Sequence, residues 1–488
     1  MSRADRYDLV IVGMGSGGMV AATFAASLPL RVAVVERDRV GGECLWTGCV
    51  PSKALLASAK VAHTLRHAER WGVPASTGAV DTAAVWARIK AVQAEIAATD
   101  DNPRHFEHLG VEVITGEARL AGPHAVVVGE RILWTRFVLL CTGSRPAAPP
   151  IEGLAEHGFL TNETVFSLDR APASLVMIGG GPIAIELAQA MVRLGVPTTV
   201  LERGETILAR EEPELVRTLG GLLEDEGVVL GTGVEVERVS VEGATKVVHG
   251  TSNGTSRRWC GAEILVATGR APNLEALGLD TAGVQATRSG VVVDDRMRTS
   301  LPWVYAAGDV AGGPLFTHAA GHQAVRAVRD MFFPGRGRVS ELVPWCTFTD
   351  PELAHVGLTA AEARKHHGSA VEVHRLDLSH SDRARAEGHR EGAVVVVTAG
   401  GTVVGGHILA PAAGEMIHEL AVAVRDEVTL AGLASLIHVY PTLATSVGQL
   451  GADAAFAAAG RWAPLVRAGR LWDRLAHRRP RSSSSRRG

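Results

Sequence analysis

Two glycine-rich turns, each between a short apolar run and a helical segment, constrain the fold of this chain more than any other feature. In the first, the apolar run 8–12 leads into Gly13-x-Gly15-x-x-Gly18, a helix is predicted at about 19–27, and the strand 32–36 ends in Glu36. A continuous apolar run is typical of a parallel strand that is covered on both faces. Strand, glycine turn, helix, strand and terminal acid together predict a Rossmann dinucleotide-binding unit.

The same pattern recurs farther along the chain. A strand at 174–178 leads into Gly179-x-Gly181-x-x-Ala184, followed by a helix at 185–194 and a strand at 198–202 that ends in Glu202. In such units the glycines let a pyrophosphate approach the helix N-terminus, and the terminal acid accepts a hydrogen bond from a ribose hydroxyl. Two units in one chain therefore predict two nucleotide cofactors.

The identity of the second nucleotide depends on the residues around Glu202. A carboxylate there favours the free 2′-hydroxyl of NAD, because it would repel a 2′-phosphate. Ala184 at the third glycine position and the adjacent Arg203 favour NADP instead. We expect NAD, with NADP as the alternative.

A pair of cysteines follows the first unit, in the stretch from Gly41 to Lys53. Cys44 and Cys49 are the only two of the five cysteines that lie close in sequence. They can form a disulfide if the backbone brings their α-carbons within about 4.4–6.8 Å, and Gly48 and Pro51 supply an irregular backbone. In a reducing compartment such a pair is typically redox-active or metal-binding; a reduced structural pair is the alternative, and no metal site is predicted. The other three are expected to be structural: Cys141, Cys260 and Cys346.

Length and charge limit the remaining possibilities. A chain of 488 residues suggests about three domains. The net charge of -3 predicts no nucleic-acid partner, although residues 461–488 carry nine arginines against one acid. The first 27 residues do not suit a signal peptide, because Asp8 and the glycines interrupt the apolar stretch. With no apolar window of about 18 residues, we expect a cytoplasmic protein.

Further turns and a change of pattern complete the sequence map. Apolar strands end at Thr142-Gly143, at Gly269 and at Gly308-Asp309. From about residue 344 the pattern favours a separate α+β domain, with antiparallel strands at 394–398 and 403–408 joined by Gly400-Gly401. Helices are expected there at about 415–424 and 445–459.

Together these residues resemble the pyridine nucleotide-disulfide oxidoreductases, the family of lipoamide dehydrogenase, glutathione reductase and mercuric reductase. The resemblance covers about residues 6–460. It implies an α/β fold with two Rossmann-like domains, for FAD and NAD(P), and a C-terminal α+β dimerisation domain. It also implies a homodimer whose active sites are completed across the interface. The expected domains are FAD-binding 1–150 and 271–343, NAD(P)-binding 151–270, dimerisation 344–460, and a basic tail 461–488.

The resemblance also assigns roles to residues. Cys44 is similar to the cysteine that attacks the substrate, and Cys49 to the one that exchanges electrons with the flavin. Lys53 and Glu186 are similar to a pair beside the flavin ring. The positions implied for FAD are Gly13, Gly15, Gly18, Glu36, Thr142, Gly143, Gly308 and Asp309; those implied for the nicotinamide nucleotide are Gly179, Gly181 and Glu202, with Gly269 a further cofactor-binding position.

One segment departs from the family pattern. Where disulfide-reducing members carry a His-Pro-Thr segment and a following glutamate, this chain has Tyr440-Pro441-Thr442 and Thr445. A tyrosine with a pKa near 10 is a poor base at neutral pH, so turnover of lipoamide or glutathione should be impaired. His438 is a candidate substitute base, with packing as the alternative.

These observations favour an enzyme that passes electrons from NAD(P)H through FAD and the cysteine pair to an acceptor. The resemblance is to the mercuric reductase branch, but no cysteine follows Cys346, so the acceptor is expected to be a disulfide, a quinone or another oxidant. The alternatives are a dihydrolipoamide dehydrogenase and a redox-sensing flavoprotein subunit without rapid turnover. His318 and His322 are candidates to face the flavin.

The arginine-rich tail allows a second kind of partner. Apolar residues recur at helical spacing among its arginines, which favours weak contact with an anionic membrane surface. Pro464 and Gly469 oppose a helix, so a solvated tail with a disordered end is the main expectation.

Overall fold

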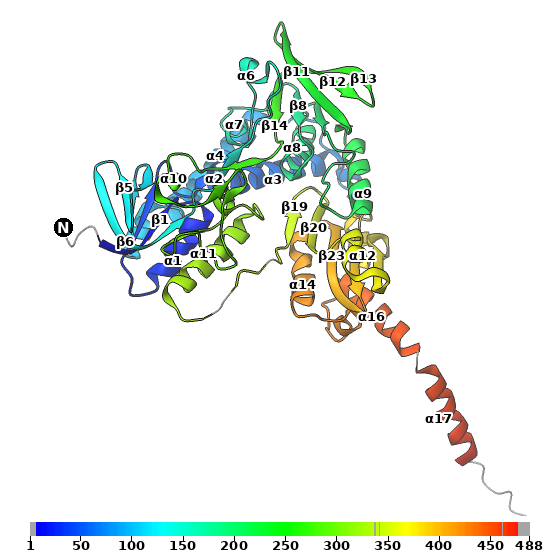
Figure 1. Ribbon diagram of the computed structural model, residues 1–488. Coiled ribbons are helices and arrows are strands. Elements are labelled where there is room, and N and C mark those ends of the chain that lie inside the picture. The colour runs from blue at the N-terminus through cyan, green and yellow to red at the C-terminus, as the bar shows by residue number, and fades with distance from the viewer. Residues whose placement is uncertain (1–5, 336–337, 341, 461, 477–488) are drawn as a thin grey trace, which may run out of the picture. The chain divides into compact units, whose positions relative to one another are not determined.

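The computed structural model describes residues 6–335, 338–340, 342–460 and 462–476. The chain forms two compact units, Met1–Glu352 and Leu353–Gly488 (Figure 1). None of the helices in the described ranges is both long and apolar enough to cross a bilayer.

The first unit contains a seven-stranded sheet. Its order is β3-β2-β1-β6-β5-β4, and β18 pairs with β6. The strands β1, β2, β3, β6 and β18 run parallel, whereas β4, β5 and β6 form an antiparallel meander. The bounds are β1 Arg6–Val12, β2 Val32–Glu36, β3 Glu112–Thr115, β4 Ala118–Leu120, β5 Ala125–Val128, β6 Arg131–Leu140 and β18 Val304–Ala306. The strands predicted at 8–12 and 32–36 are thus confirmed, and this sheet joins segments on both sides of residues 151–270.

Small residues let two helices pack tightly beside this sheet. Helix α1 (Ser16–Ala26) buries Gly17, Ala21 and Ala25 and lies against α11 (Thr317–Phe332). It begins three residues before its predicted start because Gly15 caps it and the following glycines are helical. The other helices near the start of the chain are α2 Gly42–Trp46, α3 Cys49–Arg66, α4 Thr82–Thr99 and α5 Pro103–His108.

A second parallel sheet of the first unit has the order β10-β9-β8-β14. Its elements are β8 Leu175–Ile178, α8 Pro182–Arg193, β9 Thr198–Leu201, α9 Pro213–Asp225, β10 Val229–Gly231 and β14 Glu263–Val266, which confirms the second strand-helix-strand prediction. An antiparallel sheet adjoins it in the chain: β11 Val234–Glu242, β12 Thr245–Ser252 and β13 Thr255–Gly261. Shorter elements are β7 Ser144–Pro146, α6 Leu154–His157, α7 Asn162–Val165, β15 Arg270–Pro272, α10 Leu279–Ala282, β16 Ala286–Thr287, β17 Gly290–Val291 and β19 Trp345–Thr347.

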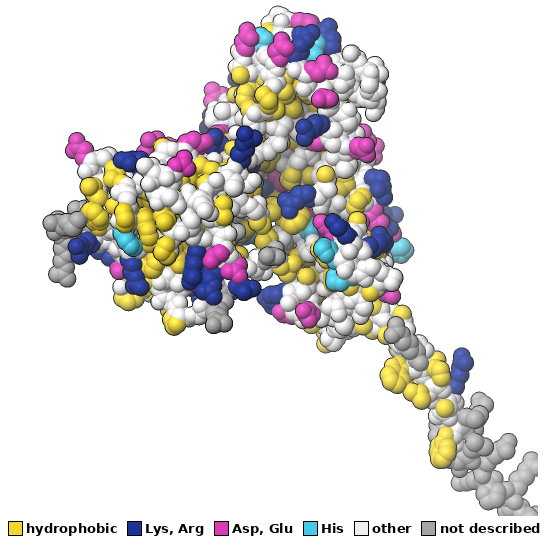
Figure 2. All heavy atoms as spheres, viewed as in Figure 1, with side chains coloured by type: hydrophobic (Ala, Val, Ile, Leu, Met, Phe, Trp, Pro, Cys, Tyr) yellow, Lys and Arg dark blue, Asp and Glu magenta, His cyan; other side chains and the backbone are white. Residues whose placement is uncertain are grey.

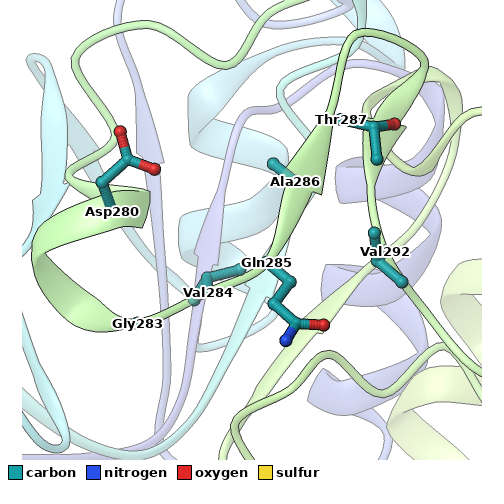
Figure 3. Close-up of a pocket in the computed structure, with 7 residues that line it drawn as sticks. All are labelled: Asp280, Gly283, Val284, Gln285, Ala286, Thr287 and Val292. Atoms are coloured by element: carbon teal, nitrogen blue, oxygen red, sulfur yellow. The ribbon is translucent and has the colours of Figure 1, made fainter.

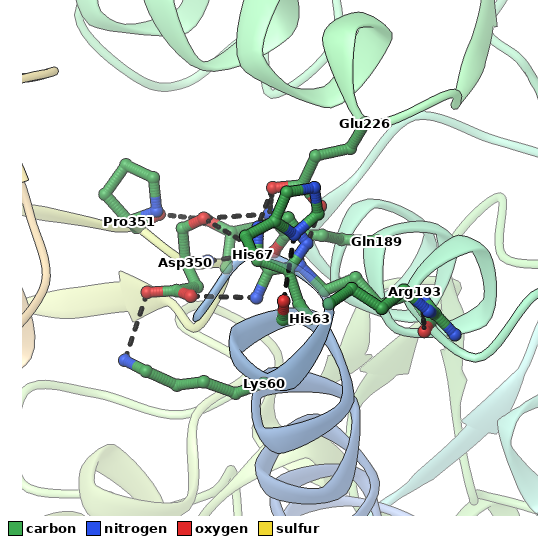
Figure 4. Close-up of polar contacts among 10 residues, drawn as sticks. Lys60, His63, His67, Gln189, Arg193, Glu226, Asp350 and Pro351 are labelled. Atoms are coloured by element: carbon green, nitrogen blue, oxygen red, sulfur yellow. Dashed lines mark hydrogen bonds and ion pairs between the residues drawn. The ribbon is translucent and has the colours of Figure 1, made fainter. Parts of the chain in front are cut away.

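An ionic network centred on the buried Arg193 joins α8 to α3 within this unit (Figure 4). The Arg193 side chain is only 5% exposed and donates to Glu226 Oε1 at 2.6 Å and to Asp350 Oδ2 at 2.8 Å. Lys60 on α3 donates to Asp350 Oδ1 at 3.0 Å, and Gln189 donates to the Asp350 carbonyl at 2.9 Å. Arg193 is therefore shared by the two carboxylates, and Lys60 is a second cation that contacts Asp350.

The second unit is the α+β structure that the sequence predicts. Strand β22 pairs antiparallel with both β21 and β23, and Gly400 and Gly401 form the predicted turn with φ of 60° and 87°, where glycine is favoured. The strands are β20 Glu352–Gly357, β21 Val371–Asp377, β22 Ala393–Ala399 and β23 Thr402–Ala410. The helices are α12 Ala360–His367, α13 Asp382–Glu387, α14 Ala413–Arg425, α15 Leu430–Leu433, α16 Thr445–Gly460 and α17 Ala463–Ala476.

Helix α17 corrects the sequence argument about the tail. Pro464 is its second residue, where the missing N–H would have had no partner inside the helix, and Gly469 is accommodated in its middle. The apolar side chains of Leu465, Val466 and Trp472 are all more than half exposed, and Figure 2 shows apolar side chains gathered along this helix. The predicted disordered end, 477–488, lies outside the described residues.

Candidate functional site

The cysteine pair lies at the junction of two helices. Cys44 is in α2 and Cys49 is the first residue of α3, and both are free thiols in the structure. Pro51 fits within the first turn of α3, so the irregular backbone between the cysteines lies at Thr47 and Gly48. The N-terminus of a helix carries a partial positive charge that stabilises an anion. The structure therefore provides the electrostatic setting that a thiolate at Cys49 requires.

Local contacts give the two sulfurs different acidities. The hydrogen bond from Cys44 is the main cause that lowers the pKa of Cys49 to about 6, against the opposing effect of burial; the Thr317 hydroxyl and Lys53 lower it further. The Thr317 Oγ1 lies 3.4 Å from the Cys49 sulfur. The same hydrogen bond and burial raise the pKa of Cys44. Near neutral pH the pair therefore consists of a thiol at Cys44 and a thiolate at Cys49.

This difference predicts a distinct pH profile for alkylation. In reduced protein, the rate at Cys49 should rise with pH around a midpoint near 6, because only the thiolate reacts, whereas an unperturbed thiol has its midpoint near pH 8.5. Mass spectrometry of iodoacetamide-treated protein at a series of pH values measures this, with the exposed Cys260 as an internal reference. A Cys49 midpoint above pH 8 would contradict the assignment.

A lysine-glutamate pair lies one turn along α3 from Cys49. Lys53 Nζ is 3.0 Å from Glu186 Oε2, and the backbone N–H of Phe348 donates to Glu186 Oε1 at 2.8 Å. Lys53 Nζ also lies 4.3 Å from the centroid of the Phe348 ring. The two residues that the family resemblance pairs are thus in contact, and Phe348 contacts both of them.

The first glycine turn fits a dinucleotide. A Cβ on Gly13 would lie 2.4 Å from the carbonyl oxygen of Cys141, so only glycine permits this turn, whereas the space beside Gly15 is open apart from the α-carbon of Gly42 at 3.9 Å. No side chain caps α1, so its first backbone N–H groups remain available to a pyrophosphate. Glu36 accepts from Met14 N at 2.6 Å and retains lone pairs for a ribose hydroxyl.

The second glycine turn repeats this geometry. A Cβ on Gly179 would lie 2.4 Å from the carbonyl oxygen of Ala267, nothing lies within 4 Å of a Cβ on Gly181, and no side chain caps α8. Glu202 accepts from Gly180 N at 2.5 Å, as Glu36 does from the residue after Gly13. The residues of both turns fit the nucleotides that the sequence predicts.

The remaining predicted FAD positions lie at the ends of β6 and β18. Gly143 and Gly308 have φ of 68° and 77°, and Thr142 Oγ1 donates to the carbonyl of Asn273 at 2.8 Å. Asp309 accepts from the hydroxyl of Ser144. Gly269, with φ of 142°, precedes β15, which pairs with β7.

Within the second unit, Tyr440 and His438 each have a carboxylate partner. The Tyr440 hydroxyl donates to Asp382 Oδ2 at 2.8 Å, which raises the pKa of Tyr440. His438 Nε2 lies 3.1 Å from both oxygens of Glu419, and a Cβ on Gly448 would lie 2.5 Å from its Nδ1. Tyr440 is 69% exposed, whereas His438 is packed into α14 and α16, which favours the packing role.

Other candidate residues have ordinary structural surroundings. His318 contacts the Pro344 carbonyl at 2.8 Å and stacks on Phe316. A surface hollow of about 490 Å³ near β16 and β17 contains none of the predicted site residues (Figure 3). It is lined by Asp280, Gly283, Val284, Gln285, Ala286, Thr287 and Val292.

Comparisons with known proteins identify the family. A model described as pyridine nucleotide-disulphide oxidoreductase matches residues 7–324, and the dimerisation domain of that family matches residues 343–450. The chain belongs to this family.

Members of the pyridine nucleotide-disulphide oxidoreductase family with several activities resemble the chain. It is 34% identical to the dihydrolipoyl dehydrogenase of Chlorobaculum tepidum, over 92% of this chain and 97% of that protein. It is 34% identical to the mercuric reductase of Bacillus cereus, over 90% of this chain and 70% of that protein. The crystal structure of LpdA from Mycobacterium tuberculosis matches with a TM-score of 0.83 at 29% identity, covering 92% of this chain and 99% of LpdA. The predicted family and fold class are confirmed, and the family is one of FAD-dependent, NAD(P)H-linked disulfide oxidoreductases.

Sequence reasoning missed several residues around the cysteines. Thr317 contacts Cys49, and Phe348 contacts Glu186 and Lys53. Both residues lie far along the chain from the cysteines, and no local sequence motif indicates these contacts. Glu43 accepts from Asn162 and Arg270, and burial raises the pKa of Glu43 to about 7 although Arg270 opposes the shift. Of these residues, only Arg270 could have been linked to the site from the sequence, since it directly follows the predicted turn at Gly269.

Proposed function

We propose that this protein passes electrons from NAD(P)H through FAD and the Cys44–Cys49 pair to a small oxidant such as a disulfide or a quinone. The observation that supports this most directly is the pair itself, with a thiolate at the N-terminus of α3 and a thiol beside it. When bound, FAD supplies hydride acceptance from the nicotinamide and electron transfer to sulfur. Overall, NAD(P)H and a proton reduce the disulfide to the two thiols, and the acceptor reoxidises them.

When the acceptor is a disulfide, the two cysteines have different roles. Cys44 passes its proton to the hydrogen-bonded Cys49 thiolate and attacks one acceptor sulfur, which forms a mixed disulfide. The other acceptor sulfur leaves as a thiolate and takes up that proton from Cys49. The Cys49 thiolate then attacks Cys44, which restores the Cys44–Cys49 disulfide and releases the second acceptor sulfur as a thiolate that takes up a proton from solvent. Lys53 is placed to balance negative charge near Cys49, and Glu186 orients Lys53.

Tyr440 argues for an acceptor that needs little base catalysis. Its hydrogen bond to Asp382 raises the pKa of Tyr440, so the phenol is a hydrogen-bond donor and not a base at neutral pH. We therefore propose an acceptor other than lipoamide or glutathione. A dihydrolipoyl dehydrogenase is the second candidate, favoured by the similarity to the Chlorobaculum tepidum enzyme. A redox-sensing subunit is the third, and it would take up electrons without rapid turnover.

The nucleotide preference and the assembly belong to the same proposal. The Glu202 carboxylate at the end of β9 supports NAD over NADP, because it lies where a 2′-phosphate would be repelled. The match of residues 343–450 to a dimerisation domain supports a homodimer. A cytoplasmic location would supply NADH and keep the five free cysteines reduced.

An anaerobic titration tests this proposal. Stepwise NADH should bleach the flavin absorbance of the purified protein and produce a long-wavelength band from the thiolate and oxidised flavin, with NADPH far less effective. Reduction by neither nucleotide would contradict the proposal. A panel of disulfides, quinones and lipoamide then identifies the acceptor.

We also propose that α17 contacts anionic membrane surfaces. By helical spacing, Trp462, Leu465, Val466 and Trp472 fall on one side and Arg467 and Arg470 on another, as in interfacial helices. Co-sedimentation should show binding to vesicles of phosphatidylcholine and phosphatidylserine in equal parts but not to phosphatidylcholine alone. Replacing both arginines by glutamate should weaken binding by at least about tenfold. Equal binding by the full chain and by a chain without residues 461–488 would exclude this role.

A further inference from the structure

The loop between the two cysteines closes on the side chain of Glu43. This residue directly precedes Cys44 in α2, and its carbonyl accepts from the N–H of Thr47 at 2.9 Å. A Cβ on Gly48 would lie 3.1 Å from the Glu43 carbonyl oxygen and 3.5 Å from its Cγ. The residue before Cys49 thus packs against the residue before Cys44, which brings the two ends of the loop together.

The side chain of Asn162 holds this loop in place by two hydrogen bonds. Its side chain is 6% exposed, and its Nδ2 donates to Glu43 Oε1 at 2.8 Å and to the Thr47 carbonyl at 3.2 Å. One buried amide therefore bridges both ends of the segment between the cysteines. Asn162 starts helix α7, whose cap at Thr161 is a reciprocal capping box, so the amide is held by a defined element.

Arg270 connects the other Glu43 oxygen to the predicted flavin-binding turns. Its guanidinium donates to Glu43 Oε2, to the Ser144 hydroxyl at 2.8 Å and to the Ser144 carbonyl at 3.2 Å. Ser144 in turn donates to Asp309. The Arg270 side chain is 12% exposed, so this ion pair is partly shielded from water. The redox loop is thereby tied to β15, β7 and the end of β18.

We propose that Glu43 is a positioning residue that sets the thiol-disulfide equilibrium of Cys44 and Cys49. This inference rests on the proposed function, in which the pair cycles between dithiol and disulfide. With its ends fixed by Asn162 and Arg270, the loop holds the two sulfurs in mutual contact before the bond forms. Holding two groups together raises their effective concentration and favours the bonded state. Releasing Glu43 should therefore destabilise the disulfide relative to the dithiol.

Two substitutions test the two halves of this arrangement. Glu43→Gln keeps the side-chain shape and the acceptor for Asn162 but removes the charge that faces Arg270. Asn162→Ala removes the amide that bridges Glu43 and the Thr47 carbonyl. Each FAD-loaded variant is equilibrated without oxygen in mixtures of reduced and oxidised dithiothreitol at pH 8, above the raised pKa of Glu43, so that the wild-type carboxylate is charged. Alkylation and mass spectrometry then measure the disulfide fraction. We expect the disulfide equilibrium constant to fall by about tenfold, which raises the potential by roughly 30 mV.

The control is Glu112→Gln, which removes a carboxylate paired with Arg131 far along the chain from the cysteines. It should leave the equilibrium constant unchanged, and the thermal midpoints of all variants show whether folding is intact. Constants within twofold of the wild-type value in both Glu43→Gln and Asn162→Ala would overturn the inference. Wild-type cysteines that form no disulfide in any mixture would instead refute the proposed function.

Discussion

Cys49→Ser should abolish turnover with every acceptor, by at least about 10³-fold, and should remove the long-wavelength band from the NADH titration. The reason is that the band and the relay both require the thiolate at the start of α3. A serine hydroxyl neither ionises at neutral pH nor forms a disulfide. FAD should remain bound and should still be reduced by NADH, because none of the predicted nucleotide-binding residues changes.

The Cys44→Ser variant distinguishes the roles of the two sulfurs. It should also stop turnover of disulfide acceptors, but the band should persist because Cys49 remains. Cys260→Ser, at an exposed position on β13, should behave as wild type. Acceptor turnover that survives in Cys49→Ser would mean that electrons leave the flavin directly, and the cysteine relay would be wrong.

Arg193→Met should cost about 3–5 kcal/mol of stability, because it leaves two largely shielded carboxylates, with side chains 14% and 18% exposed, without their shared buried cation. Arg193 is 5% exposed and contacts Glu226 and Asp350 with short bonds. Urea unfolding measures the loss. Arg425→Ala, which breaks an exposed pair with Asp426, should leave the unfolding midpoint unchanged. Equal midpoints for wild type and Arg193→Met would show that the network does not hold α8 to α3.

Acid provides an independent check of this network. Burial alone would raise the pKa of Asp350, but Arg193 and Lys60 outweigh it and hold the pKa below its usual range. The stabilisation from the lowered pKa is therefore present above about pH 4 and lost as the pH falls through the folded-state value. The stability difference between wild type and Arg193→Met should narrow in that range. A stability difference between wild type and Arg193→Met that stays constant down to pH 2 would mean that the lost stability comes from packing and not from the ion pairs.

Much of the fold could be predicted because its signals are local. The apolar runs before Gly13 and Gly179 become β1 and β8, and the Gly400-Gly401 turn joins antiparallel strands as expected. Each of these follows from a short-range rule, such as continuous burial of a parallel strand or a turn that needs positive φ. The tail was harder to predict, because Pro464 opposes a helix only inside it and not in its first turn.

The sequence by itself determined the family, the two nucleotide units and the redox pair, since each is encoded in contiguous residues. The family resemblance already assigns the flavin-facing sulfur to Cys49. Only the tertiary structure decided which contacts favour a thiolate there, namely the Thr317 hydroxyl and the start of α3. It also decided that Glu43 contacts Asn162 and Arg270, 119 and 227 residues away. Such contacts form when separate elements fold onto one another, and no spacing rule in the chain encodes them.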